Sequence, residues 1–274
     1  MTNIPKLSMI GAGNMGQALL KGLIKQNHPI SHICIADPSK EKCSAIKQKW
    51  DIHCTLDNHE AAQFADLLIL AVKPHQIKSV VKDIRTSMQR HTLILSVAAG
   101  ITAAQITSWL DNSQAPVIRA MPNTPALINQ GITALYKTNS VKQQQAHTAE
   151  KLLRAVGDTL WIEDESLMNI VTALSGSGPA YFLYILEGLV AAGEKLGLSK
   201  KIALQLTMQT AAGSIAMAQQ SESSLETLRA QVTSKGGTTE RGLEILSEHN
   251  LFSTLEKTIE QATLRGQILS EQAN

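Results

Sequence analysis

The sequence predicts an α/β fold, with an N-terminal Rossmann-type doubly wound sheet followed by an all-helical C-terminal domain. Over the first half of the chain, short apolar runs alternate with polar stretches. Runs such as residues 67–72 are apolar without alternation, as in a parallel sheet covered on both faces. A G-x-G-x-x-G turn follows the first run. After Ile162 no further strand-like run follows, so we expect domains at residues 1–162 and 163–274.

The elements of the first domain follow in order from these runs. Short, continuous apolar runs suit buried strands, and the longer stretches between them suit helices. Strands are expected at residues 7–10, 32–36, 66–72, 92–97, 116–120, 132–136 and 159–162, and helices at 14–26, 75–89 and 141–155.

The second domain is predicted to be helical throughout. Positions 182, 185, 186, 189 and 190 are apolar, which is the spacing of one helix face. Pro179 suits the first turn of this helix and Gly197 its end. Capping boxes at Ser223/Glu226 and Ser253/Glu256 predict two further helix starts. The small residues at 210–218 fit either a tight monomeric bundle or a subunit interface.

Composition excludes several classes of function. The 274 residues carry a net charge of +2, with 25 basic and 23 acidic residues and no basic block, so nucleic acid is not an expected partner. The longest near-continuous apolar stretch, at 65–72, is far shorter than the ~20 residues of a membrane helix, and the first residues lack the apolar run of a signal peptide. We therefore expect a cytoplasmic protein without a membrane partner.

The residues that most often bind metals are scattered. Eight histidines show no ligand spacing, so no metal is expected. Cys34, Cys43 and Cys54 form no C-x-x-C pair, and we expect buried or idle thiols in a reducing cytosol.

The glycine motif predicts a dinucleotide site. Gly11, Gly13 and Gly16 lie between a strand and a helix, where they permit a tight turn, approach of the backbone to a pyrophosphate and close packing of helix on strand. With Ala12, Asn14 and Met15 they present free N–H groups at a helix N-terminus, which favours phosphate. The cofactor expected is NADPH or NADH.

The end of the second strand leaves the choice of coenzyme open. Asp37 follows Gly16 by 21 residues and can accept hydrogen bonds from ribose hydroxyls, which favours NADH. Lys40 and Lys42 can instead meet the 2′-phosphate of NADPH. In a third interpretation, Asp37 and Ser39 only cap the next helix.

Three further strand ends carry candidate cofactor contacts, because ligands bind at the carboxyl edge of such a sheet. One is the segment Ala71, Val72, Lys73, Pro74, where the alternative for Lys73 is a solvated loop lysine. The second is Ala98, Ala99, Gly100. The third is Asn123, within a loop stiffened by two prolines.

At this point six motifs together resemble a known family. "GAGNMG", "AVKPH", "SVAAGI", "RAMPNTPA", "LSGSGPAY" and "SKGGTT" occur in this order over residues 5–265, and the chain is similar to pyrroline-5-carboxylate reductases. The resemblance implies hydride transfer from NAD(P)H to the C=N carbon of 1-pyrroline-5-carboxylate, which gives L-proline. It also implies a C-terminal dimerisation domain, a homodimer and a higher ring of dimers.

The resemblance assigns roles that the residues alone leave open. It places Asn58 near the adenosine, and Glu165 at the edge of the substrate pocket, where the alternative is a turn that links the domains. It places the substrate on the glycine-rich loop and Thr239 close to the ring nitrogen of the substrate. The loop residues implied are Ser234, Gly236, Gly237, Thr238 and Thr239.

The glycine-rich loop suits a small carboxylate. Gly236 and Gly237 permit backbone angles that direct successive amides towards an anion, and Ser234 and Thr238 can add hydroxyl hydrogen bonds. The alternative is that Thr238 and Thr239 only cap the helix that follows. This chain has Lys235 where the family usually has proline, which leaves the loop less constrained.

Two other functions remain in view. A β-hydroxyacid dehydrogenase would use a lysine on a long helix, but Lys195 lies only at the far end of the predicted helix. The other is a paralogue that binds NAD(P)H without turnover, which Lys235 alone favours.

Overall fold

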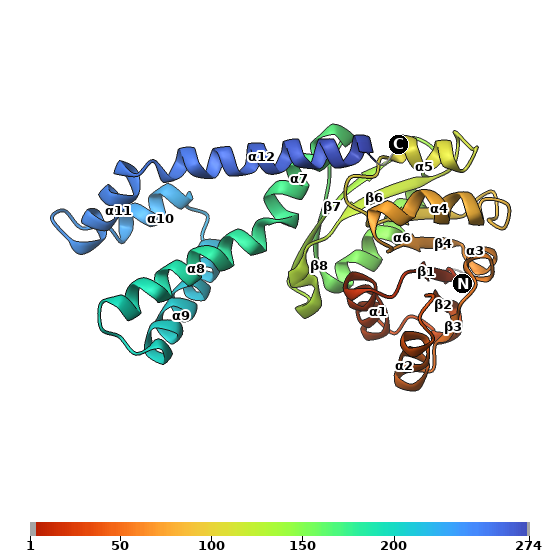
Figure 1. The fold of residues 1–274 in the computed structure, drawn as a ribbon, viewed down its shortest axis with the longest axis horizontal. Coiled ribbons are helices and arrows are strands. Elements are labelled where there is room, and N and C mark those ends of the chain that lie inside the picture. Colours follow the sequence, from red (N-terminus) through yellow and green to blue (C-terminus); the bar gives the residue numbers. More distant parts are fainter. Residues whose placement is uncertain (1–3, 273–274) are drawn as a thin grey trace. The chain divides into compact units, whose positions relative to one another are not determined.

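The protein contains one mainly parallel sheet, seen in a computed structural model that describes residues 4–272 (Figure 1). Within that range the sheet has eight strands in the order β3-β2-β1-β4-β5-β6-β7-β8. All neighbours are parallel except β6 and β7. The strands are β1 (Leu7–Ile10), β2 (Ile33–Ala36), β3 (His53–Thr55), β4 (Leu67–Leu70), β5 (Leu93–Ser96), β6 (Val117–Met121), β7 (Gly131–Lys137) and β8 (Gly157–Trp161).

The strand order has its switch point between β1 and β4. From β1 the chain runs outwards through β2 and β3, and then returns to β4 on the other side of β1. The loops that follow β1 and β4 therefore lead away from two neighbouring strands in opposite directions. Ligands of open α/β sheets bind where the strand order reverses in this way. The N–H of Ala71, just after β4, donates to the carbonyl of Ile10, at the end of β1, at 2.9 Å.

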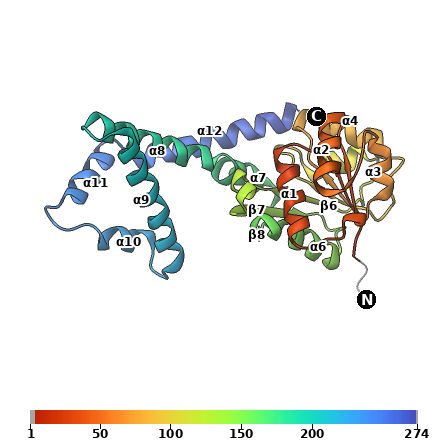
Figure 2. The ribbon, with the colours of Figure 1, turned by 90° about the horizontal axis from the view of Figure 1, so that it is seen from below.

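Helices cover both faces of this sheet (Figure 2). One apolar core joins the strands to α1 (Asn14–Lys25), α6 (Gln143–Leu153) and Ile46 of α2 (Lys40–Trp50). The other joins them to α3 (Asn58–Phe64), α4 (Pro74–Ile84) and α5 (Ala103–Trp109). The predicted doubly wound architecture is confirmed.

The remaining helices follow β8. Of the described residues, 4–177 and 262–272 form one compact unit and 178–261 a second. This division falls after Ser177, whereas we expected a boundary after Ile162. The helices are α7 (Met168–Val171), α8 (Gly178–Lys195), α9 (Lys200–Gln220), α10 (Leu225–Gln231), α11 (Thr238–Glu248) and α12 (Leu251–Gln272), the last of which contributes residues to both units.

Two predicted helix starts in the second unit are wrong. The cap of α10 is Ser224 and not Ser223, because the hydroxyl of Ser224 accepts the N–H of Thr227 at 3.2 Å. The last helix begins at Leu251, directly after Asn250 with φ of 51°, so Ser253 already lies inside it. The end of α8 is as expected, since Gly197 follows it with φ of 106°.

The cysteines also differ from expectation. Cys43 of α2 and Cys54 of β3 form a disulfide, with Cα atoms 5.3 Å apart, so the expectation of three free thiols is wrong for this pair. Their distance in space, which depends on how α2 packs beside β3, is not visible in the spacing of the sequence. Cys34 is a free, buried thiol.

Among the described residues neither a metal-binding cluster nor a membrane-spanning helix is present. No cluster of three or more His, Cys, Asp or Glu side chains is placed to hold a metal ion between residues 4 and 272. Over the same range no helix has the length and apolar character needed to cross a membrane.

Candidate active site

The glycine turn after β1 has the geometry that a pyrophosphate requires. Gly11 has φ of 101°, and a side chain there would lie 2.7 Å from the carbonyl oxygen of Ala71. A side chain on Gly16 would lie 2.6 Å from the carbonyl oxygen of Gly11. Only Gly13 faces open space, with no atom within 4 Å of an added Cβ. Gly11 and Gly16 therefore serve the close packing, and Gly13 leaves room for a ligand.

The N-terminus of α1 supplies hydrogen-bond donors to that open space. Gly13 caps α1 without a side-chain hydrogen bond, and the first intrahelical bond runs from Gln17 N–H to Gly13 O at 2.9 Å. The amides of Asn14, Met15 and Gly16 precede that bond, so they are the orphan donors of the helix end. An anion is favoured there by these donors and by the helix dipole. The residues present fit a dinucleotide.

Asp37 fastens the glycine turn. Its side chain is 5% exposed; Oδ2 accepts the N–H of Ala12 at 2.8 Å and Oδ1 accepts the N–H of Ser39 at 3.0 Å. Lys42 Nζ lies 3.4 Å from the same Oδ2. In one of the three interpretations this carboxylate accepts hydrogen bonds from ribose hydroxyls; in the structure it is buried and its two oxygens accept backbone donors. The capping interpretation fits better, with Ser39 as the cap of α2.

The exposed rim beside Asp37 carries mixed charge. Lys40 opens α2, and the Ser39 hydroxyl donates to the Glu41 carboxylate at 2.7 Å. This hydrogen bond holds the pKa of Glu41 below its usual value, so Glu41 keeps its negative charge beside the two lysines. Asn58, the other residue expected near an adenosine, is the first residue of α3 and follows the capping Asp57.

The next two strand ends meet at a cavity of about 550 Å³ within the first unit. Pro74, Ala99 and Gly100 line it, all three expected at the cofactor. Lys73, the cap of α4, has an exposed side chain, in keeping with a solvated loop lysine. The cavity is also lined by residues that the sequence did not indicate: His75, Lys78, Asn169, Thr172, Gly266, Leu269 and Gln272.

The remaining sequence candidates of the first unit are held by protein groups. Asn123 Oδ1 accepts the N–H of Ile132 at 3.0 Å, so this side chain fixes the start of β7. Glu165 Oε1 accepts from the N–H of Ala103 and from Arg119 Nη1, both at 2.7 Å. Glu165 is therefore more than part of a linking turn. Arg119 was missed, although a charged residue within an apolar strand is itself a signal.

The glycine-rich loop of the second unit joins α10 to α11. Gly236 has φ of 72°, as expected, whereas Gly237 has φ of −86° and caps α11. Thr238 and Thr239 are the first two helical residues, so the interpretation of their hydroxyls as caps is not supported. The first intrahelical bond runs from Arg241 N–H to Gly237 O at 3.2 Å, which leaves the preceding amides at an exposed helix end.

Glu240 is a loop residue that the motif did not reveal. Its Oε2 accepts the N–H of Gly236 at 2.6 Å, and Gly237 N–H donates to Ser234 O at 3.0 Å. Two amides of the expected anion nest are thus already paired inside the loop. The donors that remain for a ligand belong to the first turn of α11. Ser234, Lys235, Thr238 and Thr239 all have exposed side chains.

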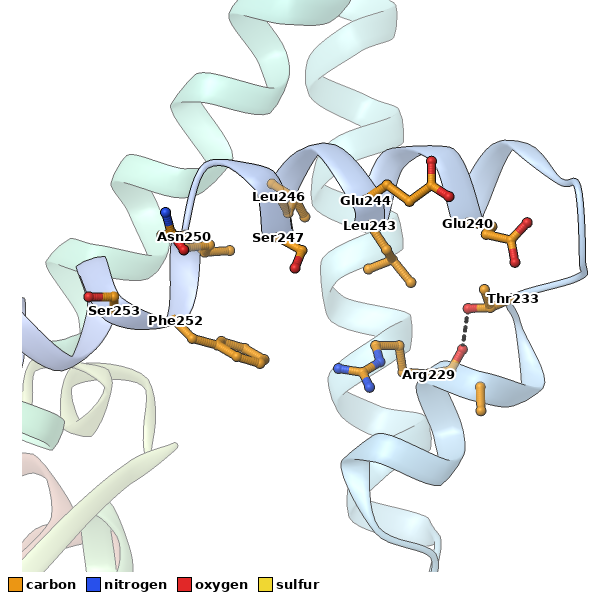
Figure 3. Close-up of a pocket in the computed structure, with 12 residues that line it drawn as sticks. Arg229, Thr233, Glu240, Leu243, Glu244, Leu246, Ser247, Asn250, Phe252 and Ser253 are labelled. Carbon is orange, nitrogen blue, oxygen red and sulfur yellow. Dashed lines mark hydrogen bonds between the residues drawn. The ribbon is translucent and has the colours of Figure 1, made fainter.

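A second cavity, of about 850 Å³, lies between α10 and α11 (Figure 3). Thr233, whose hydroxyl donates to the carbonyl of Arg229 at 2.7 Å, is on its α10 side, and Glu240 and Leu243 are on its α11 side. The side chain of Phe252 is 77% exposed and borders the same space. The cavity lies wholly in the second unit.

Fold and first site together define a class. A doubly wound sheet, a glycine turn with open space at its second glycine, and a cavity at the carboxyl edge are the features of a dinucleotide-binding oxidoreductase.

Comparison with known proteins narrows this class. Residues 165–269 match the family model "Pyrroline-5-carboxylate reductase dimerisation", and residues 6–100 match "NADP oxidoreductase coenzyme F420-dependent". A pyrroline-5-carboxylate reductase of Pseudomonas aeruginosa is 41% identical over 98% of both chains, and one of Haemophilus influenzae is 35% identical over 95% of this chain and 96% of its own. The chain belongs to the pyrroline-5-carboxylate reductase family.

Solved structures agree with this assignment. A pyrroline-5-carboxylate reductase from Coxiella burnetii has a TM-score of 0.91 at 40% identity, covering 98% of this chain and 99% of its own. A Plasmodium falciparum pyrroline carboxylate reductase with NADP bound has a TM-score of 0.87 at 29% identity, with the same coverage. A 3-hydroxyisobutyrate dehydrogenase of Mycobacterium tuberculosis, at 17% identity, TM-score 0.53 and coverage of 72% and 67%, shares the fold alone.

Proposed function

We propose that this protein reduces 1-pyrroline-5-carboxylate to L-proline with NADPH or NADH. The observation that carries the proposal is the 41% identity to a pyrroline-5-carboxylate reductase over almost the whole of both chains. The glycine turn after β1 and the glycine-rich loop before α11 supply the two binding geometries that the reaction needs. Lys195, the last residue of α8, offers no support for a β-hydroxyacid dehydrogenase.

For the cofactor, we assign the pyrophosphate to the turn Gly11–Gly16 and the adenosine end to the region of Asn58 and the rim of α2. The nicotinamide end is assigned to Ala71–Pro74 and Ala98–Gly100. When bound, the cofactor supplies the hydride. The protein residues position the imine carbon against it, and positioning of this kind supplies much of the rate enhancement.

For the substrate, we assign the carboxylate to the glycine-rich loop. The amides of Thr238, Thr239 and Glu240 at the start of α11, with the hydroxyls of Ser234 and Thr238, can donate to it. The Thr239 hydroxyl can donate a hydrogen bond to the ring nitrogen, which gains a proton as the C=N bond is reduced. Lys235 adds a positive charge beside the carboxylate.

The first experiment measures oxidation of NADPH and of NADH with 1-pyrroline-5-carboxylate, each under the same conditions. Turnover with either coenzyme supports the reductase, and the ratio of the two rates shows the preference. Binding of both coenzymes without turnover would favour a non-catalytic NAD(P)H-binding protein. Oxidation of NADPH by pyrroline-5-carboxylate but not by β-oxoacids separates the reductase from a hydroxyacid dehydrogenase.

The role of Thr239 gives a sharper prediction. Thr239→Ala should lower kcat at least tenfold, because the ring nitrogen loses its hydrogen-bond donor, while the affinity for NADPH stays unchanged. Thr254→Ala, the same change at an exposed position of α12, serves as the control and should leave kcat unchanged. A normal kcat for Thr239→Ala removes this hydroxyl from the mechanism.

We further propose that the protein is a homodimer that assembles through residues 165–269, the segment that matches the dimerisation model. A higher ring of dimers is the expected assembly, and a cytoplasmic location remains a prediction. Exposed apolar side chains on α8 and α9 support the dimer. They include Phe182, Leu183, Tyr184, Leu189, Ile202, Met208 and Ile215.

A further inference from the structure

Arg119 is a buried cation in the middle of the sheet. It lies on β6 between Ser96 of β5 and Tyr136 of β7, and is 6% exposed. A guanidinium stays charged at every accessible pH, so its charge must be balanced where it is buried. The balance comes from Glu165, whose Oε1 lies 2.7 Å from Arg119 Nη1.

The same carboxylate oxygen holds a loop. Glu165 Oε1 accepts the N–H of Ala103, the first residue of α5, at 2.7 Å. Ala103 ends the segment that begins at Ser96, and the Ser96 hydroxyl accepts the N–H of Ala98 at 3.4 Å. Ser96 is also the register neighbour of Arg119. Glu165 thus links the far end of the segment to Arg119, and the start of the segment is held by Ser96, the strand neighbour of Arg119.

The residues between these two hydrogen bonds form the part of the loop that faces the cavity. Ala99 and Gly100 line the 550 Å³ cavity, and Gly100 has φ of 74°, a backbone angle that few residues adopt. Glycine adopts this angle at little cost, so Gly100 itself does not hold the loop in one conformation. The two hydrogen bonds at the ends of the segment restrict it instead.

We propose that Arg119 and Glu165 are positioning residues for hydride transfer. Their ion pair sets where Ala98–Gly100 stand, and so where the nicotinamide ring rests against the substrate. The inference rests on the proposed assignment of this loop to the nicotinamide end. A buried ion pair adds little net stability compared with apolar residues of the same volume, so the geometry it imposes is its main contribution.

The experiment measures the contribution of the nicotinamide end of the cofactor separately from that of the adenosine end. Glu165→Gln keeps an oxygen for the Ala103 N–H but removes the negative charge facing Arg119, and Arg119→Met removes the other partner. For each variant the affinity is measured for NADPH and for 2′,5′-ADP, which lacks the nicotinamide. kcat and KM are measured with 1-pyrroline-5-carboxylate. The control is Arg85→Gln, which breaks the exposed ion pair with Asp111, 2.6 Å long.

The expected result is a loss confined to the nicotinamide end. In both variants kcat falls by about 10- to 100-fold, the range expected when reacting groups are misplaced by about an ångström. NADPH binds more weakly, by at least threefold, while affinity for 2′,5′-ADP is unchanged. Arg119→Lys, which keeps the charge, recovers part of kcat. The control changes none of these values.

Two outcomes overturn the proposal. In the first, Glu165→Gln lowers only the melting temperature and leaves kcat and the affinity for NADPH unchanged. That result would mean that the ion pair has a purely structural role. The other is an equal loss of affinity for NADPH and 2′,5′-ADP, which is a general disturbance of the site. If Arg119→Met does not fold, Glu165→Gln, nearly identical in volume, decides. If the wild-type protein shows no turnover, the proposed function fails, and the two affinities then show separately whether the ion pair positions the nicotinamide end of the cofactor.

Discussion

Cys34 shows how burial changes one side chain. It lies on β2, 0% exposed, and burial raises the pKa of its thiol from 9.0 to about 11, with the Glu60 carboxylate acting in the same direction. The folded protein therefore holds the thiol proton more tightly than the unfolded chain. The resulting stability is fully present below pH 9 and is lost as the pH rises from 9 to 11.

This shift predicts a measurable pH dependence. Between pH 8.5 and 10.5 the free energy of unfolding should fall by about 2 kcal/mol more in the wild type than in Cys34→Ala, at about 1.4 kcal/mol per pKa unit. Urea unfolding of both proteins at the two pH values measures it. All other groups titrate equally in the two proteins. The prediction is therefore contradicted if the free energies of unfolding of wild type and Cys34→Ala differ by the same amount at both pH values.

At the scale of single residues, the sequence could locate most candidates but not their partners. The three glycines of the turn were predicted with their separate roles, because the motif encodes backbone geometry. Asp37 and Asn123 were predicted as candidate cofactor contacts, and the structure adds that their side chains accept the N–H groups of Ala12 and Ile132. Such contacts depend on the packing of distant segments, which spacing along one sequence does not specify.

The glycine turn and α1 make a prediction at the scale of an element. Gly16→Ala should destabilise the fold by roughly 1–3 kcal/mol, because its Cβ would lie 2.6 Å from the Gly11 carbonyl oxygen and 2.8 Å from Met9 Sδ. Gly13→Ala should leave stability within about 0.5 kcal/mol, because nothing lies within 4 Å of its Cβ.

The same two variants, Gly13→Ala and Gly16→Ala, distinguish an effect on cofactor binding from an effect on folding. Gly13→Ala should weaken NADPH binding at least tenfold, because the new methyl occupies the space expected for the pyrophosphate. Urea unfolding gives the stabilities and fluorescence titration gives the affinities. A Gly13→Ala variant that binds NADPH normally would exclude this placement of the pyrophosphate.

The cap of α10 offers a second test at this scale. Ser224→Ala should cost about 1 kcal/mol, because the N–H of Thr227 loses its acceptor. Ser223→Ala, the neighbour that the capping-box pattern indicated, should cost less than about 0.5 kcal/mol. Thermal unfolding of the two variants compares them directly, and equal costs would mean that Ser224 is not the cap.

Elements were predicted where they are long or regularly patterned. Seven of the eight strands and the long helix from Gly178 have clear apolar patterns. The missing strand, β3, has three residues, and its His53 is exposed, so it gave no pattern to detect. The start of α12 was missed because it depends on the backbone angle of Asn250, which a capping-box pattern does not determine.

At the scale of the whole molecule, the proposed dimer can be tested through α9. Ile215 is 53% exposed and lies in the segment rich in small residues. Ile215→Glu should shift the mass measured by light scattering towards that of one chain, because a subunit interface would have to bury an unpaired charge. The control is Gln220→Glu, five positions further along α9 and on another face of the helix. This change should leave the measured mass unchanged. If Ile215→Glu stays fully oligomeric, this face of α9 is outside the interface.

The contacts of Asp37 have a consequence for protein engineering. In Rossmann folds the acidic residue at the end of the second strand commonly contacts the ribose 2′-hydroxyl, so it is an obvious residue to replace when the coenzyme choice is to be altered. In this protein that change would remove the acceptor of the Ala12 N–H and loosen the phosphate turn for both coenzymes. A redesign should keep Asp37 and vary Lys40 and Glu41 at the exposed rim instead. Asp37 is fixed by its backbone contacts, whereas the exposed side chains of Lys40 and Glu41 are free to be changed.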